Sequence, residues 1–274
     1  MVLKFAPNRR TALWGEENWL VSALAVQPSV PSPELSEMFP GTLADLAPTF
    51  PLLVKTIDAR MRLSVQVHPN ERTCLVTGGA PKAEIWFALR DSAVYAGLKP
   101  GVEPRDIERA VVDGSFEELL LRHDLKAGDA MFIPGGLVHS ICENSFIYEV
   151  QQSSDTTFRL YDWGRVGADG KPRTLHVEQA LAAIDYTLAP PEVARDVECP
   201  YFRFSRRTVC GALSLGAERY TALYVFRGEV RLRGEWLVEG ESRLILGEDG
   251  GATLEGDGAE VLVTSTVAKG RAEH

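Results

Sequence analysis

The stretch that most constrains the fold lies at residues 128–165, where two short β-like runs flank a Pro-Gly-Gly turn and lead into a polar segment that contains two arginines. Residues 131–133 (Met-Phe-Ile) are typical of a buried strand, and residues 138–141 (Val-His-Ser-Ile) are typical of a strand returning after the turn. This pattern places His139 near a hairpin corner. The next run alternates apolar and polar positions, so the carboxylate of Glu149 can point into a concave site while its neighbours pack. The stretch therefore predicts short strands arranged around a site.

A second alternating segment lies upstream. In the sequence LSVQVHP, the polar residues Ser64, Gln66 and His68 occupy one face of a predicted strand, and the apolar residues occupy the other. After a Gly-Gly-Ala-Pro loop, Lys82 and Glu84 share one face at the start of an apolar strand. A row of polar groups of this kind is expected on a strand facing water, and equally on a strand facing a metal.

The remaining chain is β-rich with a few short helices. Helical spacing with early carboxylates predicts two short helices at 103–114 and 115–125, and a short amphipathic helix at 176–185. From 199 to 267 the sequence consists of short β-runs separated by glycines, which indicates a sandwich or barrel. This last region contains no histidine.

Composition excludes several classes of protein. The 274 residues are 45% hydrophobic and 24% charged, which is ordinary for a globular chain of one large or two small domains. A formal net charge of −9 argues against partners such as nucleic acid or an anionic membrane. A local cationic pocket for a phosphorylated metabolite is compatible with this charge.

The cellular compartment is predicted from two features that the sequence lacks, a long apolar segment and paired cysteines. The first twenty residues contain no long apolar segment, and no later stretch has the length of a membrane span. The four cysteines form no CxxC pair, which favours reduced thiols over disulfides or a cysteine-bound zinc. These features predict a cytoplasmic protein that does not interact with membranes.

Three residues from separate strand-like segments form a candidate metal site. His68, Glu84 and His139 provide the two imidazoles and one carboxylate that a catalytic zinc takes while leaving a coordination position open. Other borderline transition metals would also suit this set. Each residue alone is more readily explained as structural. Their combination favours a metal.

Two arginines flank the sequence Tyr-Asp-Trp-Gly at 161–164. One interpretation is an ion pair of an arginine with the aspartate, packed over the tryptophan; the other is that Arg159 or Arg165 leaves this network to hold an anionic oxygen. Lys55 lies within an apolar run, where its charge must meet an anion or reach solvent.

Taken together, these residues resemble the type I phosphomannose isomerases, specifically the short bacterial form. Seven segments match in order: FPLLVKTIDA at 50–59, LSVQVHP at 63–69, KAEIWFAL at 82–89, YAGLKPG at 95–101, GDAMFIPGGLVHSI at 128–141, YEVQQSSDTTFRLYDWGR at 148–165 and RTLHVEQALAAID at 173–185. The resemblance implies a mainly β cupin architecture with two cupin-like β-barrel (jelly-roll) domains and a few short helices. It places a metal-bearing catalytic domain at 1–190 and a C-terminal domain without metal ligands at 191–274.

The resemblance also implies roles for individual residues. The family's zinc, one per chain, would be bound by His68, Glu84 and His139, with Gln66 as a fourth protein ligand. The catalytic arginine of the family falls on Arg159.

Four further positions carry over from the same family. Lys82 and Glu149 match active-site polar positions, while Ser64 and Lys55 match positions associated with the substrate phosphate. The sequence HPNE at 68–71 departs from the usual HPDD. This departure bears on substrate preference more than on metal binding.

The implied reaction interconverts mannose 6-phosphate and fructose 6-phosphate through an enediolate, with a phosphorylated hexose as the substrate. Either Glu149 or Lys82 would transfer the proton, and the sequence does not choose between them. One alternative is a non-catalytic sugar-binding or regulatory cupin. Another is a metal-dependent cupin enzyme acting on a different substrate, such as an iron oxygenase. Oligomeric state is open.

Overall fold

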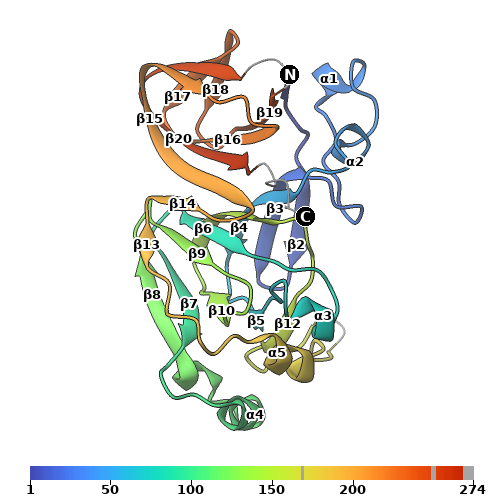
Figure 1. Ribbon diagram of the computed structural model, residues 1–274, viewed down its shortest axis with the longest axis vertical. Helices are drawn as coiled ribbons and strands as arrows, with labels where there is room; N and C mark the ends of the chain where they lie inside the picture. The colour runs from blue at the N-terminus through green and yellow to red at the C-terminus, as the bar shows by residue number, and fades with distance from the viewer. Residues whose placement is uncertain (168–169, 248–250, 268–274) are drawn as a thin grey trace, which may run out of the picture. The chain divides into compact units, whose positions relative to one another are not determined.

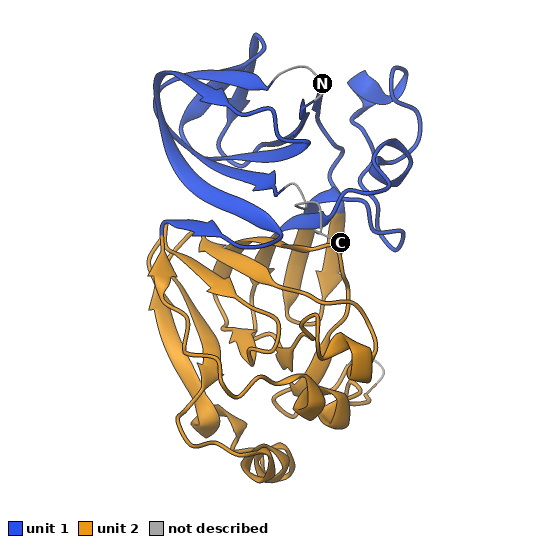
Figure 2. Cartoon of the chain, in the orientation of Figure 1, with its two compact units in different colours: residues 1–8, 19–55, 195–274 blue, residues 9–18, 56–194 orange. Residues whose placement is uncertain are grey.

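A computed structural model describes residues 1–167, 170–247 and 251–267 of the protein (Figure 1). The chain divides into two compact units, and each draws on separate parts of the sequence (Figure 2): residues 1–8, 19–55 and 195–274 form the first unit, and residues 9–18 and 56–194 form the second. Strands dominate and the helices are short, which confirms the expected mainly β fold. The assignment of domains at 1–190 and 191–274 stays a prediction, because contact-defined units need not coincide with domains.

Two antiparallel sheets account for most of the second unit. The larger sheet has the strand order β13 (Val193–Ala194), β9 (Ala130–Ile133), β6 (Glu84–Ala88), β11 (Ser145–Gln152), β4 (Leu52–Ala59), β3 (Gly15–Ser22) and β2 (Arg9–Ala12). The smaller sheet has the order β12 (Phe158–Tyr161), β5 (Val65–Val67), β10 (His139–Ile141), β7 (Ser92–Leu98) and β8 (Leu120–Leu125). Within the described residues neither sheet closes on itself.

The main core of the second unit lies between these sheets. Trp86, Met131 and Ile147 contribute to it from the larger sheet, and Ala96 and Ile141 contribute from the smaller one. Such side chains alternate with residues facing outward, because successive residues of a strand point to opposite faces. The space between the sheets is therefore filled mainly by apolar side chains. A charged side chain buried there needs a hydrogen-bonding or oppositely charged partner.

Helices cover the outer face of the smaller sheet. A second apolar cluster there joins β5 and β12 to α4 (Pro104–Asp113), the 3₁₀ helix η1 (Phe116–Leu119) and α5 (Val177–Ala183). Three further helices are one turn long: α1 (Pro33–Ser36), α2 (Leu43–Leu46) and α3 (Cys74–Thr77). The inner face of the smaller sheet, opposite these helices, faces the core of the unit.

Two sequence expectations are corrected here. Strands β9 and β10 do not form a hairpin, because β9 pairs with β6 and β10 pairs with β5 and β7 in the other sheet. The Pro-Gly-Gly turn is therefore a corner between sheets. The expected helix at 115–125 is instead η1 followed by β8, whose residues pair with β7.

The first unit holds one sheet built from both ends of the chain. Its strand order is β1 (Val2–Leu3), β19 (Ser242–Leu246), β16 (Tyr220–Arg227), β20 (Ala252–Thr266), β15 (Phe202–Leu215) and β14 (Asp196–Glu198). Strand β17 (Glu229–Leu232) also pairs with β20, and β18 (Glu235–Val238) pairs with β17. Its hydrophobic core includes the buried residues Leu223, Val225 and Val261.

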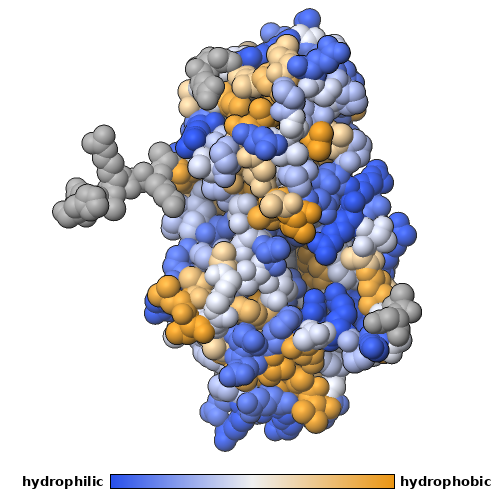
Figure 3. Space-filling view, turned by 90° about the vertical axis from the view of Figure 1, so that its right-hand side faces the viewer, coloured by the Kyte–Doolittle hydropathy of each residue, from blue (hydrophilic) through white to orange (hydrophobic). Residues whose placement is uncertain are grey.

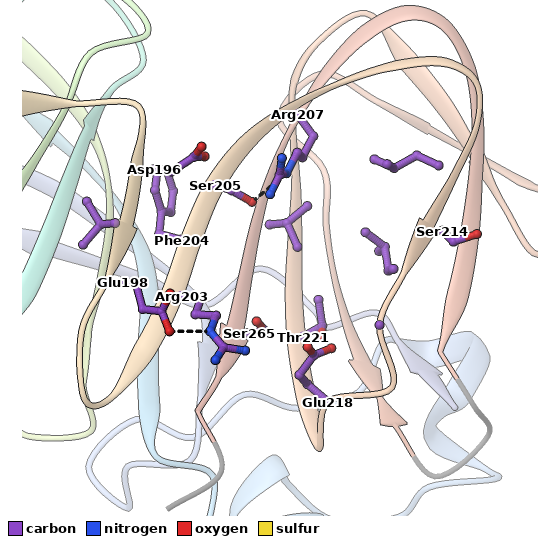
Figure 4. Close-up of a pocket in the computed structure, with 15 residues that line it drawn as sticks. Asp196, Glu198, Arg203, Phe204, Ser205, Arg207, Ser214, Glu218, Thr221 and Ser265 are labelled. Atoms are coloured by element: carbon purple, nitrogen blue, oxygen red, sulfur yellow. Dashed lines mark hydrogen bonds and ion pairs between the residues drawn. The ribbon is translucent and has the colours of Figure 1, made fainter.

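A cavity of about 480 Å³ opens beside β15 in this unit (Figure 4). Arg203 forms an ion pair with Glu198 at 2.9 Å, and Nε of Arg207 donates to Oγ of Ser205 at 3.1 Å. No histidine occurs between residues 199 and 267. The cavity therefore lacks the imidazole donors found in the second unit.

The surface is mixed in hydropathy, and the thiols are free. On the face in Figure 3, hydrophobic residues gather in small patches separated by hydrophilic ones. None of the helices within the described ranges has the length and apolar content needed to cross a bilayer. All four cysteines are free, as predicted from their spacing.

Candidate functional site

Three donor side chains meet in the second unit, between its two sheets. His68 directly follows β5 and His139 begins β10 in the smaller sheet, while Glu84 begins β6 in the larger one. Nε2 of His68 lies 3.1 Å from Nε2 of His139 and 3.2 Å from Oε1 of Glu84. Each of the three is at most 1% exposed. The structure thus brings together the three residues predicted to hold a metal.

The spacing of these atoms fits a metal ion. Two basic ring nitrogens that face each other at 3.1 Å repel unless a proton or a cation lies between them. Two nitrogens bound to one tetrahedral zinc at about 2.0–2.1 Å are themselves about 3.4 Å apart. The second oxygen of Glu84 lies 3.9 Å from Nε2 of His139. Two imidazoles and a carboxylate in this arrangement are suitable zinc ligands.

The surroundings of His139 orient its ring. Its Nδ1 lies 2.8 Å from the carbonyl oxygen of Leu137, which only accepts hydrogen bonds, so Nδ1 carries the proton and Nε2 keeps its lone pair. Metal-ligating histidines commonly have such a carbonyl partner. Nδ1 of His68 has no hydrogen-bond partner in the described part of the chain.

Charges around the cluster set the protonation states that a metal needs. Burial alone would raise the pKa of Glu84, but Lys82 and His68 hold that pKa well below its usual range. Nζ of Lys82 lies 2.7 Å from Oε1 of Glu84. Burial and repulsion by Lys82 lower the pKa of His68 to about 3, and burial also lowers the pKa of His139. At neutral pH both imidazoles are therefore neutral and the carboxylate is ionised.

Acid is expected to destabilise the metal-free protein through these histidines. The pKa of His68 is 6.5 when unfolded and about 3 when folded, so between these values the unfolded chain binds the extra proton. The free energy of unfolding should therefore fall as pH drops from 6.5 toward 3, by up to about 1.4 kcal/mol per pH unit from His68, and the lowered pKa of His139 contributes with the same sign. Urea denaturation in chelator at several pH values measures this slope. His68→Gln should reduce the slope, and an unchanged slope would contradict the assignment.

Gln66 and Arg159 extend the cluster along one row of the smaller sheet. In the strand register Gln66 pairs with His139 on one side and Arg159 on the other, so the three side chains share a face. Nε2 of Gln66 lies 3.3 Å from Nε2 of His139, and a rotation of the amide would bring its oxygen there instead. The side-chain amide of Gln66 thus lies next to the ring of His139.

The guanidinium of Arg159 stands apart from the neighbouring ion pairs. Asp162 binds Arg173, with its Oδ2 2.7 Å from Nε, and also binds Arg165. Arg159 forms no ion pair with any described residue; its Nη1 donates to the carbonyl of Thr174 at 2.8 Å. Burial, followed by repulsion from Arg173, lowers the pKa of Arg159. Of the two arginines flanking 161–164, Arg165 stays in the network and Arg159 is outside it.

Comparison with known proteins identifies the family. No protein-family model matches the chain. Mannose-6-phosphate isomerase ManA of Bacillus subtilis is 33% identical over 216 residues, which cover 73% of this chain and 65% of ManA. Mannose-6-phosphate isomerase of Streptococcus mutans is 30% identical over 224 residues, which cover 76% of this chain and 67% of the relative. The chain belongs to the mannose-6-phosphate isomerase family.

Solved structures share the fold of this member of the mannose-6-phosphate isomerase family. The crystal structure of the Bacillus subtilis mannose 6-phosphate isomerase aligns with a TM-score of 0.80 at 21% identity, covering 96% of this chain and 99% of that one. A mannose 6-phosphate isomerase crystallised with zinc and yttrium aligns with a TM-score of 0.69 at 16% identity, covering 97% and 100%. These structures confirm the predicted cupin fold. The sequence match spans less than two thirds of ManA.

Three other residues that were predicted to belong to the site, Ser64, Lys55 and Glu149, lie on other segments of this family member. Ser64 is buried just before β5, two residues ahead of Gln66. Lys55 is also buried but belongs to the first compact unit, so its role stays a prediction. Glu149 lies on β11 and accepts a hydrogen bond from Nε1 of Trp86 at 2.9 Å.

Trp86 was not among the predicted site residues. It lies two residues after Glu84 on β6, so both side chains point to the same face of the sheet. Its ring contacts that of His139 edge-on, with centroids 5.3 Å apart. The alternation of side chains along β6 indicates that Trp86 faces the same way as Glu84. An apolar run around a tryptophan is, however, more simply interpreted as core.

Proposed function

We propose that this chain is a zinc-dependent mannose-6-phosphate isomerase that holds one zinc ion. The observation that carries the proposal is the pair of neutral imidazoles whose Nε2 atoms face each other at 3.1 Å beside the ionised Glu84. Family membership supports the reaction, and the zinc-containing structure of a mannose 6-phosphate isomerase supports the metal. The substrate class is a phosphorylated hexose.

The metal ligands in this proposal are His68, Glu84 and His139, with Gln66 as the fourth. When bound, zinc supplies a Lewis acid that polarises the oxygens of the sugar. Lys82 balances the charge of Glu84 across 2.7 Å and keeps the carboxylate ionised and oriented.

Glu149 is the proposed base for proton transfer. Isomerisation removes a proton from C2 of the aldose and adds a proton to C1 of the enediolate, while the hydroxyl proton on O2 is lost and O1 gains one; a single carboxylate can carry out both steps at carbon. Lys82 is already engaged with Glu84, which favours Glu149 for this role. The guanidinium of Arg159 is proposed to stabilise the negative oxygen of the enediolate, since no carboxylate among the described residues neutralises it.

Ser64 and Lys55 are proposed to contact the substrate phosphate. Ser64 directly precedes β5, two residues ahead of Gln66, so a substrate reaching from the metal ligands along β5 would come near its hydroxyl. Lys55 would supply a positive charge. Both roles rest on the family resemblance.

The proposal is tested by metal analysis and a coupled assay. Purified protein is expected to contain about one zinc per chain and to form fructose 6-phosphate from mannose 6-phosphate; chelation should stop turnover and added zinc should restore it. Turnover that is unaffected by complete metal removal would contradict the proposed role of zinc. Bound zinc without turnover on this sugar would instead favour a sugar-binding cupin or an enzyme acting on another substrate.

A further inference from the structure

Trp86 and Glu149 form a buried pair that spans two strands. In the register of β6 and β11 the two residues are directly opposite each other, so their side chains leave the sheet on the same face. Nε1 of Trp86 donates to Oε2 of Glu149 at 2.9 Å. The exposed fractions are 1% for Trp86 and 2% for Glu149. The contact is therefore shielded from solvent.

The indole has little freedom to move. It lies in the core between the sheets, opposite Met131 on the neighbouring strand β9, and its ring meets the ring of His139 at an interplanar angle of 78°. An N–H group on a rigid ring holds a carboxylate oxygen in one place better than a flexible donor does. Trp86 therefore touches a metal ligand with its ring and the proposed base with its N–H.

We propose that Trp86 is a positioning residue, which fixes the carboxylate of Glu149 relative to the metal ligands through its indole N–H. This inference rests on the proposed function, because it assigns Trp86 a part in the same reaction. The indole acts through Glu149 and does not itself contact the substrate. Misplacement of a reacting group by about 1 Å costs on the order of 100-fold in rate.

A double-mutant cycle tests this inference. Trp86→Phe keeps an aromatic ring in the core but removes the N–H, and it should lower kcat by about 10- to 100-fold with KM and zinc content little changed. In the Glu149→Gln background the same change should cost less than about 2-fold, because there is then no carboxylate to position. Equal losses in both backgrounds would assign Trp86 to packing alone and overturn the proposal.

Trp163 provides a matched control. Its Nε1 also donates a hydrogen bond, to the carbonyl oxygen of Leu63 at 2.6 Å, and it makes no described contact with Glu149. Trp163→Phe therefore removes the same kind of bond elsewhere in the unit. Its effect on kcat, whatever its size, should be the same in the wild-type and Glu149→Gln backgrounds. Non-additivity with this control would show that the cycle reports general loosening and would overturn the proposal.

An NMR measurement separates this inference from the proposed function. In a ¹⁵N-labelled sample, Glu149→Gln should shift the indole N–H resonance of Trp86 more than that of Trp163, whether or not the protein turns over substrate. Loss of the resonance in Trp86→Phe, or in Trp86→Tyr if the first variant does not fold, assigns it. If the chemical shift of the Trp86 indole N–H does not change in Glu149→Gln, the contact between the two side chains is contradicted. Absence of wild-type turnover with a shifted resonance would remove the proposed reaction and leave the contact intact.

Discussion

Replacing His139 with alanine is expected to abolish both zinc binding and turnover. The change removes one of two imidazoles and leaves His68, Glu84 and Lys82 around a hole between the sheets. Loss of even an outer-shell partner weakens metal binding about 10- to 100-fold, so loss of a direct ligand should exceed 100-fold. Metal analysis after dialysis and the coupled assay measure the two effects.

His123 offers a control for this experiment. It lies on β8 of the same sheet, where its Nε2 is 3.0 Å from the carbonyl oxygen of Ala96, and it belongs to no metal-ligand group. His123→Ala should retain zinc and turnover. Zinc should also raise the melting temperature of wild type and of this control but not of His139→Ala, since only a protein that binds the ion is stabilised by it. Stoichiometric zinc in His139→Ala would show that the site lies elsewhere.

Replacing Arg159 with alanine is expected to separate catalysis from metal binding. The guanidinium contacts Thr174 through one nitrogen and takes no part in the ion pairs of Asp162, so its removal leaves both the fold and the ligands in place. Removing one preorganised donor to a developing oxyanion costs about 100- to 1,000-fold in kcat. Zinc content, circular dichroism and steady-state kinetics together measure the outcome.

Two further variants test whether the loss of kcat is specific to the guanidinium of Arg159. Arg159→Lys keeps a positive charge but lacks the planar fork, so we expect partial recovery of kcat relative to alanine. Arg122→Ala removes an exposed arginine that pairs with Asp124 on β8, and it should leave kcat unchanged. If Arg159→Ala loses zinc, or keeps full activity, then this arginine does not stabilise the reaction as proposed.

Local pattern was sufficient to predict the strands that carry the site. Alternation in 63–69 placed Gln66 and His68 on one face, and the structure has β5 there. The burial of the four apolar residues 85–88 of β6 likewise followed from their sequence. The grouping of His68 with residues on other strands, by contrast, depended on their combination and on the family resemblance, because ligands this far apart in sequence follow no regular spacing.

Pairing between strands could not be predicted from the sequence. The Pro-Gly-Gly turn indicates a reversal of the chain but does not distinguish a hairpin from a corner between two sheets. Residues 115–125 have apolar residues at a spacing that fits a helix, yet 120–125 pair with β7, because contact with a neighbouring strand overrides local propensity. The bond from Trp86 to Glu149 depends on the register of two strands that lie far apart in the chain.

The pairing of β1 with β19 affects the order in which the protein folds as it is made. Met1 and Leu246 are hydrogen-bonded although 245 positions separate them. At translation rates of about 5–20 residues per second, β1 waits on the order of tens of seconds after leaving the ribosome before its partner strand exists. During this time residues 56–194 can already assemble the metal ligands. A nascent chain is therefore expected to acquire zinc-binding capacity before its first strand is paired.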